Sequence, residues 1–211
     1  MGFREREHLV PDPVREQIAG DSRGRYEGPA GVRFLLVDGV AAGPGINDDG
    51  SGTAWQLDLA EAVAKSHPKN KIRFMWFGGE EDGLVGSQYY AAHLSQAEVN
   101  KIDVMIDTDM IASPNYARFV YDGDGSDGGP VGPPGSAGIE DIFTNYFDKQ
   151  GLASEPTDFD GRSDYGPFIA VGIPAGGLFS GAEGIKTDEE AAIYGGTAGV
   201  AYDKCYHQAC D

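Results

Sequence analysis

Short apolar runs separated by polar turns form the main pattern of the chain. Five runs have the length and character of β-strands: VRFLLV (32–37), KIRFMWF (71–77), IDVMIDTDMI (102–111), RFVYD (118–122) and IPAGGLF (173–179). Apolar residues dominate the first three runs, which predicts strands buried in the core of the protein.

Longer segments between these runs carry apolar residues at helical spacing: 53–67, 84–94 and 139–150. Asp49, Gly50 and Ser51 supply a start signal for the first helix, with Asp49 as its N-cap. Strands that alternate with helices indicate one α/β domain, over residues 31–211, with a mainly parallel central sheet. Residues 1–30 show no sustained periodicity, and we expect them to form a weakly ordered leader.

Residues 122–138, DGDGSDGGPVGPPGSAG, are too rich in glycine and proline for regular structure. The aspartates suggest a calcium loop, but the closing glutamate of an EF-hand is missing. We expect a solvated surface loop.

The charge of the chain excludes some classes of partner. Among 211 residues, 16 are basic and 34 acidic, for a net charge of −18. This charge argues against binding to nucleic acid and to anionic membrane surfaces. No run of 18 apolar residues predicts a transmembrane helix, and the charged N-terminus lacks the apolar core of a signal peptide.

The two cysteines, Cys205 and Cys210, lie five positions apart. The spacing permits a local disulfide, which implies an oxidising compartment. Two reduced, unconnected thiols are the alternative that the sequence leaves open.

Two acidic turns carry most of the chemical information. GPGINDDGSGT (43–53) and WFGGEEDG (76–83) each follow a predicted strand and place carboxylates on a glycine-rich turn. Carboxylates that crowd together repel one another unless a cation or a proton compensates them. Ligands of parallel α/β sheets bind at the carboxyl ends of the strands, where these turns fall. The sequence therefore predicts a metal-centred hydrolase site.

Six motifs, in order, resemble the secreted bacterial double-zinc aminopeptidases: GPGINDDGSG, WFGGEEDGLVGS, DTDMIASPN, DGRSDYGPF, GIPAGGLFSGAEG and GGTAGVAYDKCYHQACD. The resemblance covers roughly residues 36–211. It implies a three-layer αβα sandwich of the zinc exopeptidase type, truncated at both ends. It also implies zinc as cofactor, peptides with a free N-terminus as substrates, a monomer, and an extracellular location in agreement with the cysteine pair.

The resemblance assigns four metal ligands. Asp48 matches the aspartate that bridges two zinc ions, and Glu81 and His207 match the other ligands of one of these ions. Asp109 matches a ligand of the second zinc. Asp107 lies on the same strand, and period-two alternation places both aspartates on one face, but the family motif favours Asp109.

Further roles follow from the resemblance. Glu80 matches the general base, and Tyr206 matches the tyrosine that donates a hydrogen bond to the developing oxyanion. Gly161 and Arg162 match a turn near the free amino terminus of the substrate. Two further matches are Phe179, in the wall of the apolar side-chain pocket, and Asp38, a carboxylate that orients a histidine ligand.

The chain departs from the family at one metal ligand. The family has a histidine twelve residues before the bridging aspartate, where this chain has Leu36, and leucine cannot coordinate zinc. We therefore expect one firmly bound zinc and one weak or empty position. The disulfide is expected to hold His207 in place.

The sequence thus predicts a metallo-aminopeptidase that prefers large apolar first residues. One alternative is a catalytically impaired peptidase-like module that binds peptides or proteins. Another is an amidase or carboxypeptidase with the same zinc arrangement.

Overall fold

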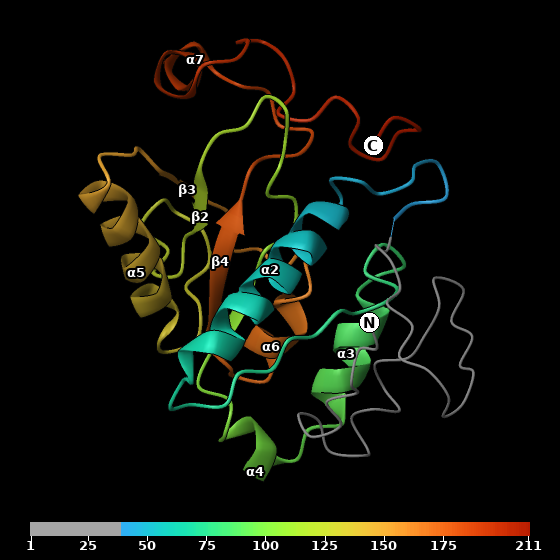
Figure 1. The fold of residues 1–211 in the computed structure, drawn as a ribbon, viewed down its shortest axis with the longest axis vertical. Helices are drawn as coiled ribbons and strands as arrows, with labels where there is room; N and C mark the ends of the chain where they lie inside the picture. The colour runs from blue at the N-terminus through green and yellow to red at the C-terminus, as the bar shows by residue number, and fades with distance from the viewer. Residues whose placement is uncertain (1–38) are drawn as a thin grey trace.

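The computed structural model describes residues 39–211 (Figure 1). The predicted leader, the predicted strand at 32–37, Leu36 and Asp38 lie outside the described residues, so their predictions stay open.

In the described part of the chain, four short strands form the central sheet: β1 (Met105–Asp107), β2 (Phe119–Tyr121), β3 (Glu155–Thr157) and β4 (Ala175–Phe179). Their order is β1-β4-β2-β3. β1 runs parallel to β4 and β2 runs parallel to β3, whereas β2 and β4 are antiparallel. Parallel pairs therefore predominate, as predicted.

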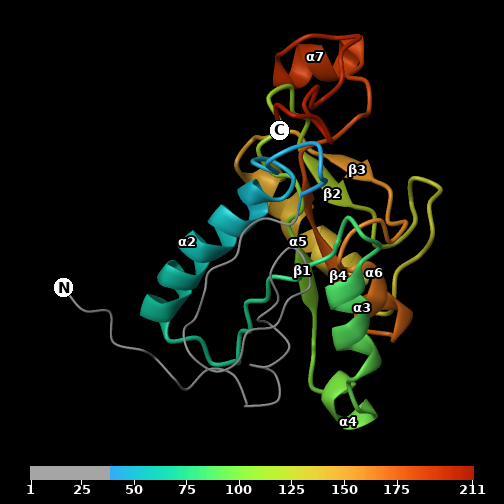
Figure 2. The ribbon, with the colours of Figure 1, turned by 90° about the vertical axis from the view of Figure 1, so that its right-hand side faces the viewer.

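Within residues 39–211, six helices surround this sheet: α2 (Gly50–Ser66), α3 (Val85–Ala92), α4 (Gln96–Val99), α5 (Ser136–Lys149), α6 (Gly166–Ala170) and α7 (Asp188–Tyr194). Helix α5 packs on β2 and β4, and α2 lies on the opposite side of the sheet (Figures 1 and 2). Helices α3 and α6 pack against each other, and in Figure 1 they lie to the right of the strands, as α2 does, whereas α5 lies to the left. The arrangement confirms a layered αβα fold.

Segment 71–77 corrects one prediction, because it adopts no β-structure. A strand requires hydrogen bonds to a neighbour, and this run pairs with no strand within residues 39–211. The guanidinium of Arg73, within this run, donates a hydrogen bond to the hydroxyl of Tyr90 on α3.

The core lies between β1, β4 and the helices α3 and α6. Its rings pack closely: Phe159 stacks on Tyr165 with centroids 4.8 Å apart, and Phe77 contacts Phe168 at 6.0 Å. The buried members of this cluster are Tyr90, Met105, Tyr121, Phe159, Tyr165, Phe168, Ile173 and Ala175. Among the described residues, no helix has both the length and the apolar character needed to cross a bilayer.

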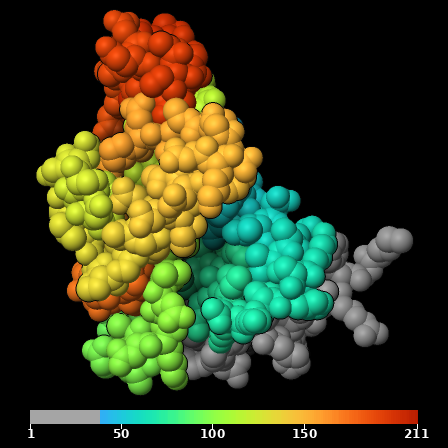
Figure 3. Space-filling view, turned by 90° about the vertical axis from the view of Figure 1, so that its left-hand side faces the viewer, coloured from blue at the N-terminus to red at the C-terminus, as the bar shows by residue number. Residues whose placement is uncertain are grey.

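The C-terminal residues form a lobe at one end of the molecule (Figure 3). The last residues return to the loop that precedes α2 (Figures 1 and 2). There the backbones touch, since a Cβ added to Gly43 would lie 2.3 Å from the carbonyl oxygen of Gln208. The fold thus joins the two ends of the described chain.

Candidate metal centre

Three distant side chains meet at the tip of α2. The ligand atoms of Asp48, Glu81 and His207 all lie within 4.8 Å of one another. His207 Nε2 is 2.9 Å from Glu81 Oε1 and 3.2 Å from Asp48 Oδ2. Two carboxylates and an imidazole at this spacing are a donor set that zinc favours.

The loop before α2 holds Asp48 in position. Asp48 is buried, and the peptide bond between it and Asp49 is cis. The Asp49 side chain caps α2 by accepting from Gly52 N at 3.0 Å, as predicted, and it also accepts from Met110 N at 3.1 Å. Gly52 is required here, because an added Cβ would lie 1.9 Å from the carbonyl oxygen of Thr108. The helix start is thereby tied to the segment after β1.

A tight turn presents the two neighbouring glutamates. Gly79 has φ +75°, and the Glu80 carbonyl accepts from Gly83 N at 2.9 Å and Leu84 N at 2.8 Å. The turn leads directly into α3. Glu81 lies beside His207, whereas Glu80 lies among Asp109, Asp164 and the other site carboxylates.

The structure distinguishes Asp109 from Asp107. Asp109 follows the end of β1 and adjoins Asp48, which raises its pKa after the larger effect of burial. Asp107 is buried near Asp109, Asp164 and Ser163, and burial raises its pKa well above the usual range. Of these two aspartates, Asp109 is therefore the one that extends the cluster at Asp48.

The electrostatics of the cluster fit a bound cation. Burial, followed by the neighbouring carboxylates, raises the pKa of Asp48 and of Asp109 to about 7 and that of Glu80 to about 9. Within the described part of the chain, Asp109 Oδ1 is buried and accepts no hydrogen bond. Buried carboxylates that raise one another's pKa are stabilised in their ionised form by a divalent cation. The residues present thus fit the zinc that the sequence predicts.

Tyr206 and His207 lie within a closed loop. The Tyr206 ring stacks on the His207 imidazole with centroids 3.8 Å apart. Cys205 and Cys210 form a disulfide around the pair, which confirms the bonded alternative. Burial, followed by Asp48, raises the pKa of Tyr206, so its hydroxyl keeps its proton next to the acidic cluster.

The residues predicted to contact the substrate are spread more widely. The Gly161 N–H donates to the Tyr165 hydroxyl at 2.8 Å, and the exposed Arg162 forms an ion pair with Glu183 at 3.2 Å. Phe179 is half-buried and packs on Phe119 at 6.0 Å.

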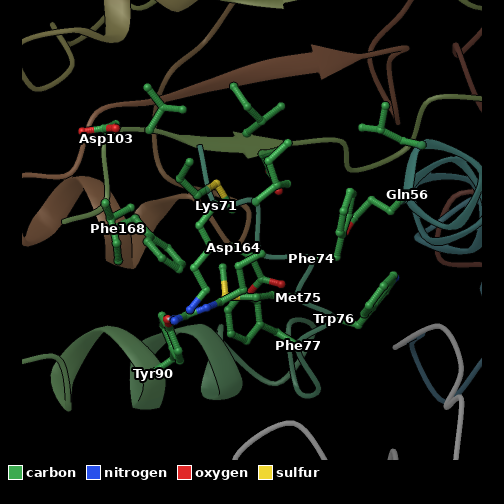
Figure 4. Close-up of a pocket in the computed structure, with 18 of the residues that line it drawn as sticks. Gln56, Lys71, Phe74, Met75, Trp76, Phe77, Tyr90, Asp103, Asp164 and Phe168 are labelled. Carbon is green, nitrogen blue, oxygen red and sulfur yellow. The ribbon is translucent and has the colours of Figure 1, made fainter. Parts of the chain in front are cut away.

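A cavity of about 1010 Å³ adjoins the acidic cluster, and Figure 4 shows part of its lining. Its polar end includes Asp48, Glu80 and Asp109, and the rest lies between segment 68–77, α2 and β1. Phe74 and Trp76 stack along one wall, with ring centroids 6.4 Å apart. The run predicted as a strand therefore lines this cavity.

A second group of carboxylates, Asp122, Asp124 and Glu140, lies in and beside the glycine-rich loop. Backbone N–H groups donate to them: Asp127 N to Asp122 at 2.9 Å and Gly123 N to Glu140 at 2.8 Å. These bonds order the loop.

Several polar residues of the site carry no predicted role. Asp164 lies near Glu80, and Asn47, Asp203 and Asp211 are buried around the Asp48 loop. Each belongs to or adjoins a quoted motif, but a polar residue in a turn has no periodicity that would reveal its partners.

The chain belongs to peptidase family M28, whose model matches residues 37–211. It is 53% identical over 210 residues to an aminopeptidase of Pseudomonas aeruginosa, an alignment that covers 97% of this chain and 39% of that protein. It is 56% identical over 175 residues to a probable leucine aminopeptidase 2 of Aspergillus oryzae, covering 83% of this chain and 35% of that protein. These relatives confirm the resemblance read from the six motifs.

A solved structure shares the fold. The zinc aminopeptidase of Bacillus subtilis known as BSAP superposes with a TM-score of 0.63 at 30% identity, covering 81% of this chain and 37% of that one. The chain therefore spans less than two fifths of the length of each of these three proteins.

Proposed function

We propose that this chain carries the catalytic site of a zinc-dependent aminopeptidase. The observation that supports it best is that Asp48, Glu81 and His207 lie together, although 159 positions (207 − 48) separate Asp48 from His207 in the sequence. Membership of family M28 and the zinc aminopeptidase fold of a neighbour point to the same chemistry.

Zinc would be held most firmly by Glu81, His207 and Asp48, which supply three protein ligands, the usual number for catalytic zinc. Asp48 and Asp109 alone would hold a second ion, because Leu36 replaces the family's histidine. Two carboxylates favour harder metals. One firm zinc and one weak or empty position are therefore expected.

When bound, zinc polarises the scissile carbonyl and lowers the pKa of water. Glu80 is the proposed general base: it takes a proton from the attacking water and delivers it to the leaving amine. Its carboxylate lies beside the ligand Glu81 and points among the other carboxylates of the site. A dication nearby favours the ionised form of Glu80 that this role requires.

Tyr206 is the proposed donor to the developing oxyanion. Its hydroxyl is protonated and lies close to Asp48 and Arg162. A preorganised donor of this kind lowers the barrier by about 3–4 kcal/mol. Gly161, Arg162 and Phe179 are proposed to surround the amino-terminal residue of the peptide, which is large and apolar.

The proposed substrates are peptides with a free N-terminus, acted on by a monomer. We propose an extracellular location, because the Cys205–Cys210 disulfide forms and persists in oxidising compartments.

The test is hydrolysis of leucyl-p-nitroanilide by the purified chain, with zinc counted by atomic absorption. We expect hydrolysis that a chelator abolishes and zinc restores, and no cleavage when the leucyl amine is acetylated. Cleavage of the acetylated p-nitroanilide would favour the amidase alternative, and cleavage of an N-acetylated peptide at its free carboxyl end would favour the carboxypeptidase alternative. Absence of both zinc binding and hydrolysis would overturn the proposal.

The Leu36 replacement supports a second candidate, a peptidase-like module that binds peptides without cleaving them. It predicts peptide binding by the zinc-loaded chain with no release of p-nitroaniline. Zinc-dependent turnover excludes it.

A further inference from the structure

The side chain of Asn47 is the centre of a buried hydrogen-bond network behind the metal centre. Asn47 is 8% exposed. Its Nδ2 donates to Asp203 Oδ2 at 2.7 Å and to Ser113 Oγ at 3.1 Å, and its Oδ1 accepts from Ala112 N at 3.1 Å. Both amide hydrogens and one carbonyl lone pair are thus used.

These bonds join three of the four segments that carry proposed metal ligands, and the turn with Glu81 is the fourth. Asn47 itself precedes Asp48. Its partners after β1 lie three and four positions beyond Asp109. Asp203 begins the turn that leads to His207. A single amide therefore links ligands that are remote in sequence.

Two buried carboxylates extend the network on both sides. Asp203 Oδ1 accepts from Cys205 N at 2.7 Å and so orders the start of the disulfide loop. Asp211 Oδ1 accepts from Asn47 N at 2.9 Å and from Asp48 N at 3.4 Å. Asp203 and Asp211 are 3% and 5% exposed, so solvent does not compete for these bonds.

We propose that Asn47 is a positioning residue for the metal centre, acting through Asp203 and the backbone of the Asp48 loop. The inference rests on the proposed function, because it concerns how tightly the site holds zinc. Residues that orient metal ligands typically contribute about 10–100-fold to metal affinity. The network sets the distance between the Asp48 loop and the His207 loop before zinc arrives.

The first test is Asn47→Asp, which keeps the shape of the side chain and the acceptor for Ala112 N. The new carboxylate cannot donate to Asp203, and it faces that carboxylate instead. We expect the zinc dissociation constant to rise about 10–100-fold. It is measured on the 211-residue chain by competition with a chromophoric chelator, a readout that does not depend on turnover.

The pair can also be exchanged. Asn47→Asp combined with Asp203→Asn restores one donor and one acceptor between the two positions and restores the net charge of the unmodified chain. Cys205 N retains an acceptor oxygen at position 203, and Ala112 N retains one at position 47. We expect the exchanged pair to bind zinc more tightly than either single variant, including when Asn47→Asp alone folds poorly.

Asn115→Asp is the matched control. Asn115 lies in the loop after β1 that also carries Ala112 and Ser113, and its Nδ2 donates to the carbonyl oxygens of Thr197, Ala201 and Val200. This variant makes the same chemical change in a hydrogen-bond network that is only partly buried and that contains no proposed metal ligand. We expect a lower melting temperature of the metal-free chain and an unchanged zinc dissociation constant.

The outcomes separate this inference from the proposed function. Equal zinc affinity for the unmodified chain and Asn47→Asp overturns the positioning role alone. If the losses of zinc affinity in the two single variants simply add in the exchanged pair, with no recovery, the positioning role is overturned as well. An unmodified chain that binds no zinc overturns the proposed function and this inference together.

Discussion

The phenol ring of Tyr206 lies flat on the imidazole of His207, with an interplanar angle of 25°. The contact couples a proposed catalytic donor to a proposed metal ligand. A change at Tyr206 can therefore act through its hydroxyl or through the position of His207.

Tyr206→Phe separates these two effects, because it keeps the ring and removes the hydroxyl. We expect kcat for leucyl-p-nitroanilide to fall about 10²–10³-fold, the usual effect of losing one oxyanion donor. The zinc dissociation constant should not change. Tyr206→Ala, which also removes the ring, should weaken zinc binding; equal zinc affinity in both variants would argue against the coupling.

Glu80→Gln tests the general base. The amide has the size of the carboxylate but cannot accept the proton, so kcat should fall by at least about a hundredfold while zinc remains bound. Asp82→Asn is the control, since Asp82 is exposed in the same turn. A rate for Glu80→Gln close to that of the control would eliminate the role.

Removal of the metal should make the stability of the chain sensitive to pH. Asp48 and Asp109 ionise near pH 7 and Glu80 near pH 9 in the metal-free fold, because they are buried together, whereas unfolded carboxyls ionise at about pH 4. The fold therefore binds more protons than the unfolded chain between these values. The free energy of unfolding should therefore fall as pH rises from about 4 to about 9.

Zinc should reverse this slope, since ionised carboxylates bind it better. At a free zinc concentration of about 100 times the dissociation constant, the added stability is about 2.7 kcal/mol. Thermal unfolding of chelated and zinc-loaded protein across this pH range provides the measurement. A chelated chain that gains stability between pH 7 and 9 would contradict the expectation that the pKa values of these carboxyls are raised in the metal-free fold.

Leu36→His tests the missing ligand. The substitution supplies the histidine that the family has at this position, so tightly bound zinc should increase from one ion per chain to two, with a gain in turnover. Leu35→His is the matched control, because it adds the same side chain one position away. An unchanged zinc count in Leu36→His would refute the expected cause of the weak site.

The sequence predicted the elements whose cores are periodic or strongly apolar. Helix α5 and strand β4 lie where spacing and apolar runs placed them, and Asp49 caps α2 as its position before Gly50 indicated. The strand predicted at 71–77 was wrong, because an apolar run does not indicate whether a neighbouring strand is available for pairing. Strand β3, Glu155–Thr157, has three residues and no apolar signal.

The motifs of the site could be predicted from the sequence, whereas the contacts between them could be predicted only in part. Carboxylates in glycine-rich turns indicated a cation, and the order of the motifs indicated a family. The contacts of Asn47 with Asp203 and of Asp211 with the Asp48 loop join residues more than 150 positions apart. No local pattern encodes such pairs. Helix α7 was missed although its capping box, Thr187 and Glu190, is readable from the sequence.

The disulfide between Cys205 and Cys210 has a practical consequence for anyone preparing this protein. Cells that keep thiols reduced would produce the polypeptide without the disulfide that encloses Tyr206 and His207. Material from the bacterial periplasm, or refolded with a glutathione couple, is therefore the proper starting point for counting zinc. Assays run with dithiothreitol would measure the reduced protein, in which this disulfide is broken.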